Sequence, residues 1–193
     1  PRQAPILYPI PKLYTGVALA ARHNLFQEDK VYFEKVLVPL DGSELAEAVL
    51  PYALDIAQHH NSVLILLQVV PLPSQVIGYV GTADLAPAPP PDLSAVEESL
   101  QEEVRQAEGY LSRKAAELMQ KGVKAQWVVV RGRPGEAIVQ SAKEQNADLV
   151  AISTHGRSGL GRMIFGSVAD HVLRNSGLPV LVIKPDMKGE GEG

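Results

Sequence analysis

From residue 34 onward the chain alternates short apolar runs with amphipathic stretches, and this alternation limits the folds that it can adopt. The clearest run, Ser62 to Val70, is almost wholly apolar and has the length of one strand. Such a run is typical of a central parallel strand that is covered on both faces. Further strand-length runs are residues 35–40, 126–130, 148–153 and 179–184.

Four helices are expected between these strands. The first begins at a cap formed by Asp41 or Ser43 and continues to about residue 60, with a bend where Pro51 removes one helical hydrogen bond. The second is long, begins at a Ser94 to Glu97 capping box and stops before residue 122. Its apolar spacing fits packing on a sheet better than a coiled coil, because it spans few heptads. The third covers about residues 134–145, and the last ends near residue 175.

This order of elements predicts an α/β fold with a five-stranded parallel doubly wound sheet. The expected strand order is 3-2-1-4-5 with helices on both faces, because parallel crossovers are right-handed and both faces need cover. In such a sheet the chain changes direction between the first and fourth strands, and a crevice opens at their carboxyl ends. Residues 39–43 and 153–161 are therefore predicted to meet there.

The second of these segments is rich in glycine and carries no acidic residue. Glycine lets the backbone approach a ligand closely, and the amides that begin the next helix attract anions. With Arg157 in this segment and Arg162 directly after it, the stretch suits a polyphosphate. The spacing is not that of an ordinary P-loop, since Arg162 and Met163 stand where that motif has Lys and Ser or Thr. It is not a dinucleotide fingerprint either, because Ile164 takes the third glycine position.

Composition narrows the functional classes. A chain of 193 residues suits one α/β domain with extensions, and its 46% hydrophobic and 21% charged residues are typical of a globular protein. The net charge of −4 and the lack of a basic stripe argue against a nucleic-acid partner. There is no cysteine, and no apolar stretch reaches the roughly 20 residues of a membrane span. No membrane partner and a cytoplasmic location are expected.

Three regions fall outside the regular alternation. Residues 1–32 bear prolines without a sustained period, so an N-terminal extension is expected before a folded domain of residues 33–186. Residues 71–92 are rich in proline and are expected to form a long loop within that domain. Residues 187–193 are expected to be a flexible tail.

The sequence of about residues 33–185 resembles the universal stress protein (UspA-like) family. The resemblance rests on residues 36–43 (VLVPLDGS), residues 149–166 and residues 178–182 (LPVLV). The ATP-binding branch of that family has the motif G-x-x-G, nine residues, then G-[ST]. Here Gly156 is the second glycine, and nine residues separate it from Gly166 and Ser167. Ser153 departs from the motif, because it stands where the first glycine should be.

The resemblance implies ATP, or AMP or ADP, as the ligand, with Mg²⁺ or Mn²⁺ accompanying the nucleotide. It implies that Asp41 contacts the ribose or the metal, and that the Val69 backbone contacts adenine. Gly156, Arg157, Gly166, Ser167 and Val168 would contact the phosphates. Ser153 would either crowd the ligand or donate a hydrogen bond to it. The full predicted site comprises Pro39, Leu40, Asp41, Ser43, Val69, Ser153, His155, Gly156, Arg157, Gly166, Ser167 and Val168.

Simpler interpretations of these residues stay open. Asp41 and Ser167 are also suited to capping helices, and Arg157 to a surface position. His155 has no acidic or nucleophilic neighbour in sequence and is interpreted as structural or solvent-facing.

The resemblance also implies a homodimer in which the last strand, Val180, Leu181, Val182 and Ile183, pairs antiparallel with its copy. An exposed apolar edge strand needs such cover. We predict a dimeric stress-response module that binds adenine nucleotides without efficient chemistry. A slow ATPase or nucleotidyl-transfer enzyme and a nucleotide-free scaffold are the alternatives, because no convincing general base is evident.

Overall fold

The computed structural model describes residues 32–72, 93–154 and 166–185. The chain divides into two units, Pro1–Val31 and Tyr32–Gly193, and every described residue belongs to the second. Residues 1–31 of the expected extension, most of the proline-rich loop and the tail lie outside the described residues. The elements are β1 (Lys35–Pro39), α1 (Glu44–Glu47), α2 (Leu50–His60), β2 (Val63–Val70), α4 (Leu93–Gln120), β3 (Lys124–Arg131), α5 (Pro134–Glu144), β4 (Leu149–Ser153), α6 (Ser167–Asn175) and β5 (Val180–Ile183).

The five strands form one parallel sheet in the order β3-β2-β1-β4-β5, which confirms the predicted class and strand order. β1 is central, and its Val36 pairs with Leu64 of β2 and with Leu149 of β4. From the central β1 the chain first adds β2 and β3 on one side of the sheet, and it then adds β4 and β5 on the other side. The carboxyl ends of β1 and β4 therefore border the switch point at which ligands bind in this class of sheet.

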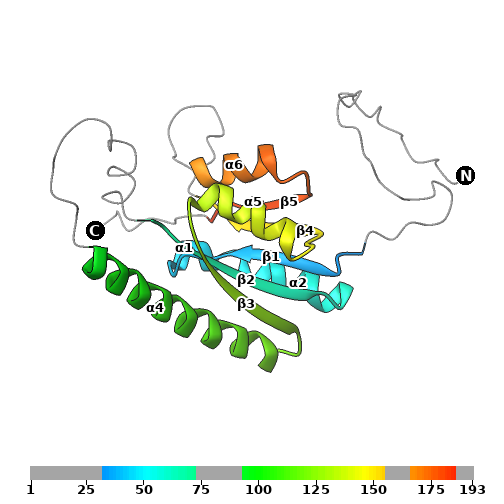
Figure 1. The fold of residues 1–193 in the computed structure, drawn as a ribbon. Helices are drawn as coiled ribbons and strands as arrows, with labels where there is room; N and C mark the ends of the chain where they lie inside the picture. Colours follow the sequence, from blue (N-terminus) through cyan, green and yellow to red (C-terminus); the bar gives the residue numbers. More distant parts are fainter. Residues whose placement is uncertain (1–31, 73–92, 155–165, 186–193) are drawn as a thin grey trace, which may run out of the picture. The chain divides into compact units, whose positions relative to one another are not determined.

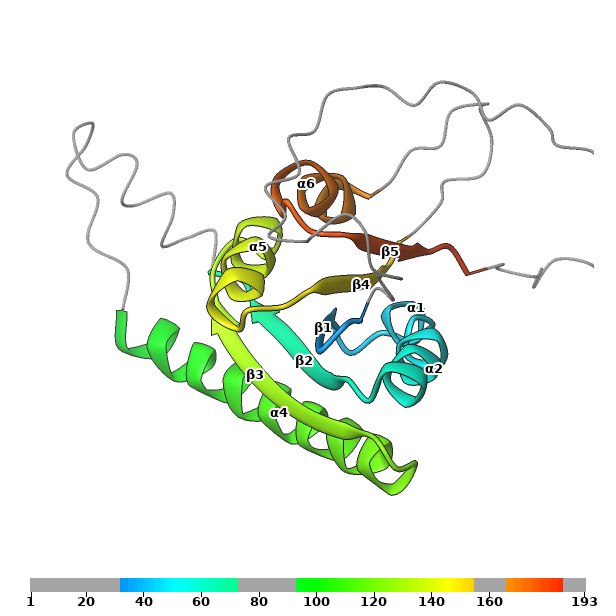
Figure 2. The ribbon, with the colours of Figure 1, turned by 90° about the vertical axis from the view of Figure 1, so that its right-hand side faces the viewer.

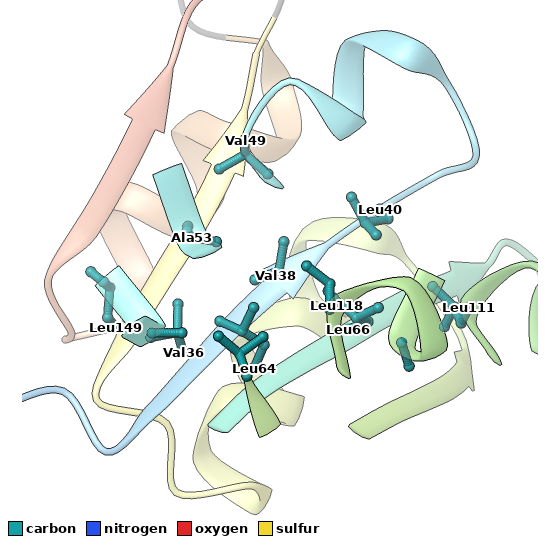
Figure 3. Packing of buried hydrophobic residues seen from close by; sticks show 14 of the residues in the cluster. Val36, Val38, Leu40, Val49, Ala53, Leu64, Leu66, Leu111, Leu118 and Leu149 are labelled. Carbon is teal, nitrogen blue, oxygen red and sulfur yellow. The ribbon is translucent and has the colours of Figure 1, made fainter. Parts of the chain in front are cut away.

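Helices cover both faces of the sheet (Figures 1 and 2). On one face, strand residues such as Val38 and Leu66 pack against α2 and α4, and Leu111 of α4 is wholly buried there (Figure 3). On the other face, Leu37 packs with residues of α5 and α6, including Val172. Neighbouring strand residues point to opposite faces, so an uninterrupted apolar run serves both layers. Each fully buried large side chain contributes about 2 kcal/mol.

The predicted single helix from Ser43 to about His60 is wrong. The structure has α1 and α2 instead, separated by a turn at Ala48 and Val49. Pro51 has no N–H to donate, and it lies in the first turn of α2, where none is required. The chain therefore starts a new helix at this point instead of bending one.

The start of the long helix also differs from the predicted one. α4 begins at Leu93, so Ser94 lies within the helix rather than before it. The Glu97 carboxylate accepts a hydrogen bond from Arg131 at the end of β3 (3.2 Å). Other element boundaries differ from the predicted ones by one or two residues.

Candidate functional site

The turn after β1 is organised by two side chains. Gly42 has a φ of +85°, a conformation that glycine adopts without strain. The Ser43 Oγ accepts a hydrogen bond from the Ala46 N–H (3.1 Å) and so caps α1. The Asp41 Oδ1 in turn accepts hydrogen bonds from the Ser43 N–H (3.0 Å) and the Ser43 Oγ–H (2.6 Å). Ser43 is therefore the cap, whereas the exposed Asp41 carboxylate holds the turn through Oδ1, and its Oδ2 makes no hydrogen bond among the described residues.

The end of β4 and the start of α6 are joined by a hydroxyl group. Thr154 is buried, and its Oγ1 accepts a hydrogen bond from the Gly166 N–H (3.0 Å). Gly166 occupies the cap position of α6, and Ser167 is the first helical residue, so Ser167 is not the cap. Among the residues that the structure describes, no side chain caps this helix by a hydrogen bond. Its first-turn amides are thus not satisfied by a capping side chain.

Ser153 turns its hydroxyl toward the neighbouring strand. Its Oγ donates a hydrogen bond to the Ile183 carbonyl of β5 (3.3 Å). The hydroxyl therefore has a partner within the protein. His155, Gly156 and Arg157, which the sequence places next in the site, lie outside the described residues.

One cavity of about 530 Å³ brings the ends of β1, β2 and β4 together with the start of α6. Of the predicted site residues, it is lined by Pro39, Leu40, Asp41, Val69, Ser153, Gly166, Ser167 and Val168. Ser43 does not line it and acts through its hydrogen bonds to Asp41. Residues separated by more than a hundred positions in sequence thus meet at the switch point.

The cavity also contains residues that the sequence did not single out. Thr154 and Gln68 are polar, and Leu45, Pro134 and Ile138 supply apolar walls from α1 and α5. Gln68 had a signal in the sequence, because it is the polar residue that interrupts the apolar run of β2. Thr154 carried no such sequence signal beyond its position next to Ser153, because its hydrogen-bond partner Gly166 lies on the other side of the glycine-rich segment.

A partly buried network links α1 to α4. The Tyr110 O–H of α4 donates to Glu47 Oε1 (2.8 Å), and the Lys114 ammonium lies 2.9 Å from Glu47 Oε2. Burial raises the pKa of Tyr110 well above its ordinary value, and its hydrogen bond to Glu47 and the negative charges of Glu47, Asp41 and Glu117 raise it further. The hydrogen bond to Glu47 likewise raises the pKa of Lys114. These bonds join α1 to α4 and so hold the turn that carries Asp41.

The cavity offers polar groups of two kinds. The uncapped amides of α6 attract an anion, and the Asp41 carboxylate at the end of β1 can accept hydrogen bonds or hold a cation. Within residues 32–72, 93–154 and 166–185, no group of three or more His, Cys, Asp or Glu side chains is placed to hold a metal ion. In the same ranges, no helix is long and apolar enough to cross a membrane.

The fold and cavity define an α/β protein with a ligand site at the switch point of a doubly wound sheet. Residues 33–184 match the universal stress protein family, and this chain belongs to that family. It is 30% identical over 166 residues to universal stress protein MJ0531 of Methanocaldococcus jannaschii, covering 86% of this chain and 91% of that protein. It is 31% identical over 156 residues to universal stress protein Sll1388 of Synechocystis, covering 79% and 98%.

Solved structures share the fold. The structure of hypothetical protein MJ0577 of Methanocaldococcus jannaschii matches with a TM-score of 0.65 and 26% identity, covering 82% of this chain and 100% of that chain. A universal stress protein of Archaeoglobus fulgidus in complex with dAMP matches with a TM-score of 0.53 and 20% identity, covering 80% of this chain and 100% of that one. The second likeness concerns the fold alone.

Proposed function

We propose that this protein is a stress-response module that binds an adenine nucleotide, ATP or its AMP and ADP forms, in the cavity between β1, β2, β4 and α6. The observation that carries the proposal is the cavity itself, which joins an uncapped helix N-terminus to a carboxylate at a topological switch point. Family membership supports a role in the stress response. The Archaeoglobus protein with dAMP indicates that this fold accommodates an adenine nucleotide.

The order of the strands suggests how the nucleotide lies. The ends of β4, β1 and β2 follow one another across the sheet, with about 4.8 Å between neighbouring strands. The phosphates would bind the amides of Ser167 and Val168 at α6, with His155, Gly156 and Arg157 of the adjoining segment contributing to this end of the site. The ribose hydroxyls would bind Asp41, and the base would lie beside the backbone of Val69.

A divalent cation would arrive with the nucleotide. Mg²⁺ commonly takes one or two carboxylates and completes its octahedron with phosphate oxygens and water. Asp41 fits that requirement, because one of its oxygens holds Ser43 and the other is left for a ligand. Mg²⁺ or Mn²⁺ would neutralise phosphate charge in this position.

Binding without rapid turnover is the favoured activity. Phosphoryl transfer needs a positioned water or hydroxyl and a group that orients it. Among the described residues of the cavity, Asp41 is the ionisable side chain, and its Oδ1 is already engaged by Ser43. We therefore expect slow ATP hydrolysis at most.

Equilibrium dialysis with ATP tests the proposal, with the Asp41→Asn variant alongside the unmodified protein. The asparagine keeps the Oδ1 acceptor for Ser43 but loses the charge, so ATP should bind about tenfold more weakly. Asp55→Asn, an exposed aspartate on α2, is the matched control and should leave affinity unchanged. Failure of the unmodified protein to bind ATP, AMP or ADP would favour a nucleotide-free scaffold. Stoichiometric ADP formation in a single turnover would instead favour an ATPase.

We also propose that the protein assembles as a homodimer through β5. Within the described part of the chain, this strand is at the edge of the sheet and pairs with β4 alone. Its residues Val180, Leu181, Val182 and Ile183 are apolar and partly exposed. Antiparallel pairing with the β5 of a second copy would satisfy the outward backbone groups and cover these side chains.

A further inference from the structure

Gln68 stands out among the residues of β2. Its Oε1 is buried, and among the described residues it has no hydrogen-bond partner. Native proteins rarely leave a buried acceptor unpaired, because burial removes its bonds to water. A carboxamide in this state is held by packing and not by a hydrogen bond to its Oε1.

Gln68 forms part of the wall between two cavities. It lines the cavity of about 530 Å³ described above, together with Val69 and Pro71. The same three residues line a second cavity of about 290 Å³, which extends to Gln106 and Tyr110 of α4. The carboxamide therefore lies at the β2 end of the site, the end opposite the amides of α6.

Two other polar side chains of the second cavity, Gln106 and Tyr110, already have hydrogen-bond partners. The Gln106 Nε2 donates to Glu102 Oε1 (3.1 Å), and the Tyr110 hydroxyl donates to Glu47. Gln68 differs from the exposed Gln106 and from Tyr110, because its oxygen is buried and has no partner among the described residues. The last torsion of a glutamine side chain is broad and roughly two-fold, so the carboxamide can turn either end toward a ligand.

We propose that Gln68 reads the nucleobase and selects a 6-aminopurine, an inference that rests on the proposed nucleotide site. One carboxamide presents an acceptor and a donor side by side. This pair matches the N6 amino group and the N7 of adenine, which donate and accept in the same order. A 6-oxopurine presents two acceptors on that edge, so the carboxamide oxygen would face a second oxygen. Gln68 is thus a specificity-determining residue.

The test compares AMP with IMP, which replaces the 6-amino group by an oxo group and protonates N1. Isothermal titration of the unmodified protein should give AMP about tenfold tighter binding than IMP. In Gln68→Leu the AMP affinity should fall about tenfold and the preference should vanish. Gln106→Leu is the matched control, a glutamine on the same cavity whose amide already has a partner, and it should keep both values.

A second readout separates recognition from a merely structural role. Because Gln68→Leu removes an unpaired buried acceptor, its ligand-free melting temperature should equal or exceed that of the unmodified protein, while its AMP affinity falls. In the unmodified protein, AMP should shift the Gln68 side-chain amide signals in a ¹⁵N-correlated NMR spectrum. If AMP binds but Gln68→Leu keeps the AMP preference, the inference fails and the nucleotide site stands. If the unmodified protein binds neither nucleotide, the proposed function fails first.

Discussion

The Thr154 hydroxyl connects the two chain segments that flank the glycine-rich stretch. It accepts a hydrogen bond from the Gly166 N–H, and a Cβ added at Gly166 would lie only 3.3 Å from that oxygen. Gly166 has a φ of −59°, which any residue adopts, so glycine is favoured here by the close approach of Thr154 and not by backbone conformation. The start of α6 is therefore fitted closely against the end of β4.

Replacing Thr154 by valine should destabilise the protein by about 1–2 kcal/mol, because the shape is kept while the Gly166 N–H loses its acceptor. Urea denaturation followed by circular dichroism measures this loss. Thr154→Ser keeps the hydroxyl and is the control, with an expected loss below that of valine. Equal stability of the valine variant and the unmodified protein would show that the Gly166 amide finds another partner.

At the scale of the elements, α1 depends on α4. α1 has only four residues, Glu44–Glu47, too few to be stable by itself. Its Glu47 binds both Tyr110 and Lys114 of the 28-residue α4. The position of the Asp41 turn is thus set by a helix that is distant in sequence.

This contact predicts a pH dependence of stability. Tyr110→Phe removes the hydrogen bond to Glu47 and should lower the free energy of unfolding by about 1 kcal/mol at pH 7. This value is below that of a fully buried hydrogen bond to a charged group, because both side chains are partly exposed to solvent. In the unfolded chain a tyrosine ionises near pH 10, whereas the raised pKa of Tyr110 keeps its proton in the folded state. The stability that Tyr110 contributes is therefore present below about pH 10 and is lost as the pH rises further.

Urea titrations of both proteins between pH 7 and pH 11 measure the effect. The two stability curves should converge above about pH 10, since tyrosines and lysines elsewhere affect both proteins equally. Curves that stay parallel across this range would contradict the proposed origin of the pKa shift.

The edge strand β5 gives a prediction about assembly. The carbonyls of Pro179 and Ile183 accept hydrogen bonds from β4, so the alternation of a strand directs the N–H of Val182 outward. Val182→Pro removes that outward donor and leaves the β4 ladder intact. The dimer dissociation constant should rise about tenfold or more, as measured by sedimentation.

Val182→Thr keeps both the N–H and the β-branched shape, and it should remain dimeric. Circular dichroism checks that the proline variant is folded. A proline variant that sediments as an intact dimer would place the interface elsewhere on the molecule.

At the scale of the whole molecule, all described elements belong to the unit Tyr32–Gly193. A ligand that binds only the folded state stabilises it by about 2.7 kcal/mol at one hundred times its dissociation constant. For a chain of this size we expect AMP or ATP at that concentration to raise the melting temperature by about 5–10 °C. Inorganic phosphate at the same concentration is the control and should give a smaller shift.

The same thermal shift should occur in a chain reduced to residues 32–193, because none of the described cavity residues belongs to the first unit. Differential scanning calorimetry of both chains makes the comparison. A shift that disappears with residues 1–31 would show that the N-terminal unit takes part in binding.

The sequence by itself determined the class of fold, the order of the strands and the approximate bounds of most elements. These follow from local periodicity and from connectivity, because an apolar run such as residues 62–70 is typical of a covered parallel strand and crossovers have one hand. The same logic predicted that Asp41 and Ser153 lie near one cavity, as the structure has them. Local rules were wrong where two signals competed, as at Pro51, which starts a helix instead of bending one.

Only the tertiary structure decided which polar groups are paired and which are not. Thr154 accepts a hydrogen bond from Gly166, and Tyr110 donates one to Glu47. Gln68 Oε1 has no partner among the described residues. Side-chain hydrogen bonds of this kind depend on distances set by the docking of helices on the sheet, which no local pattern contains. Hydrophobic periodicity specifies which face of an element is buried, but a hydrogen bond requires its two atoms to approach within about 3 Å.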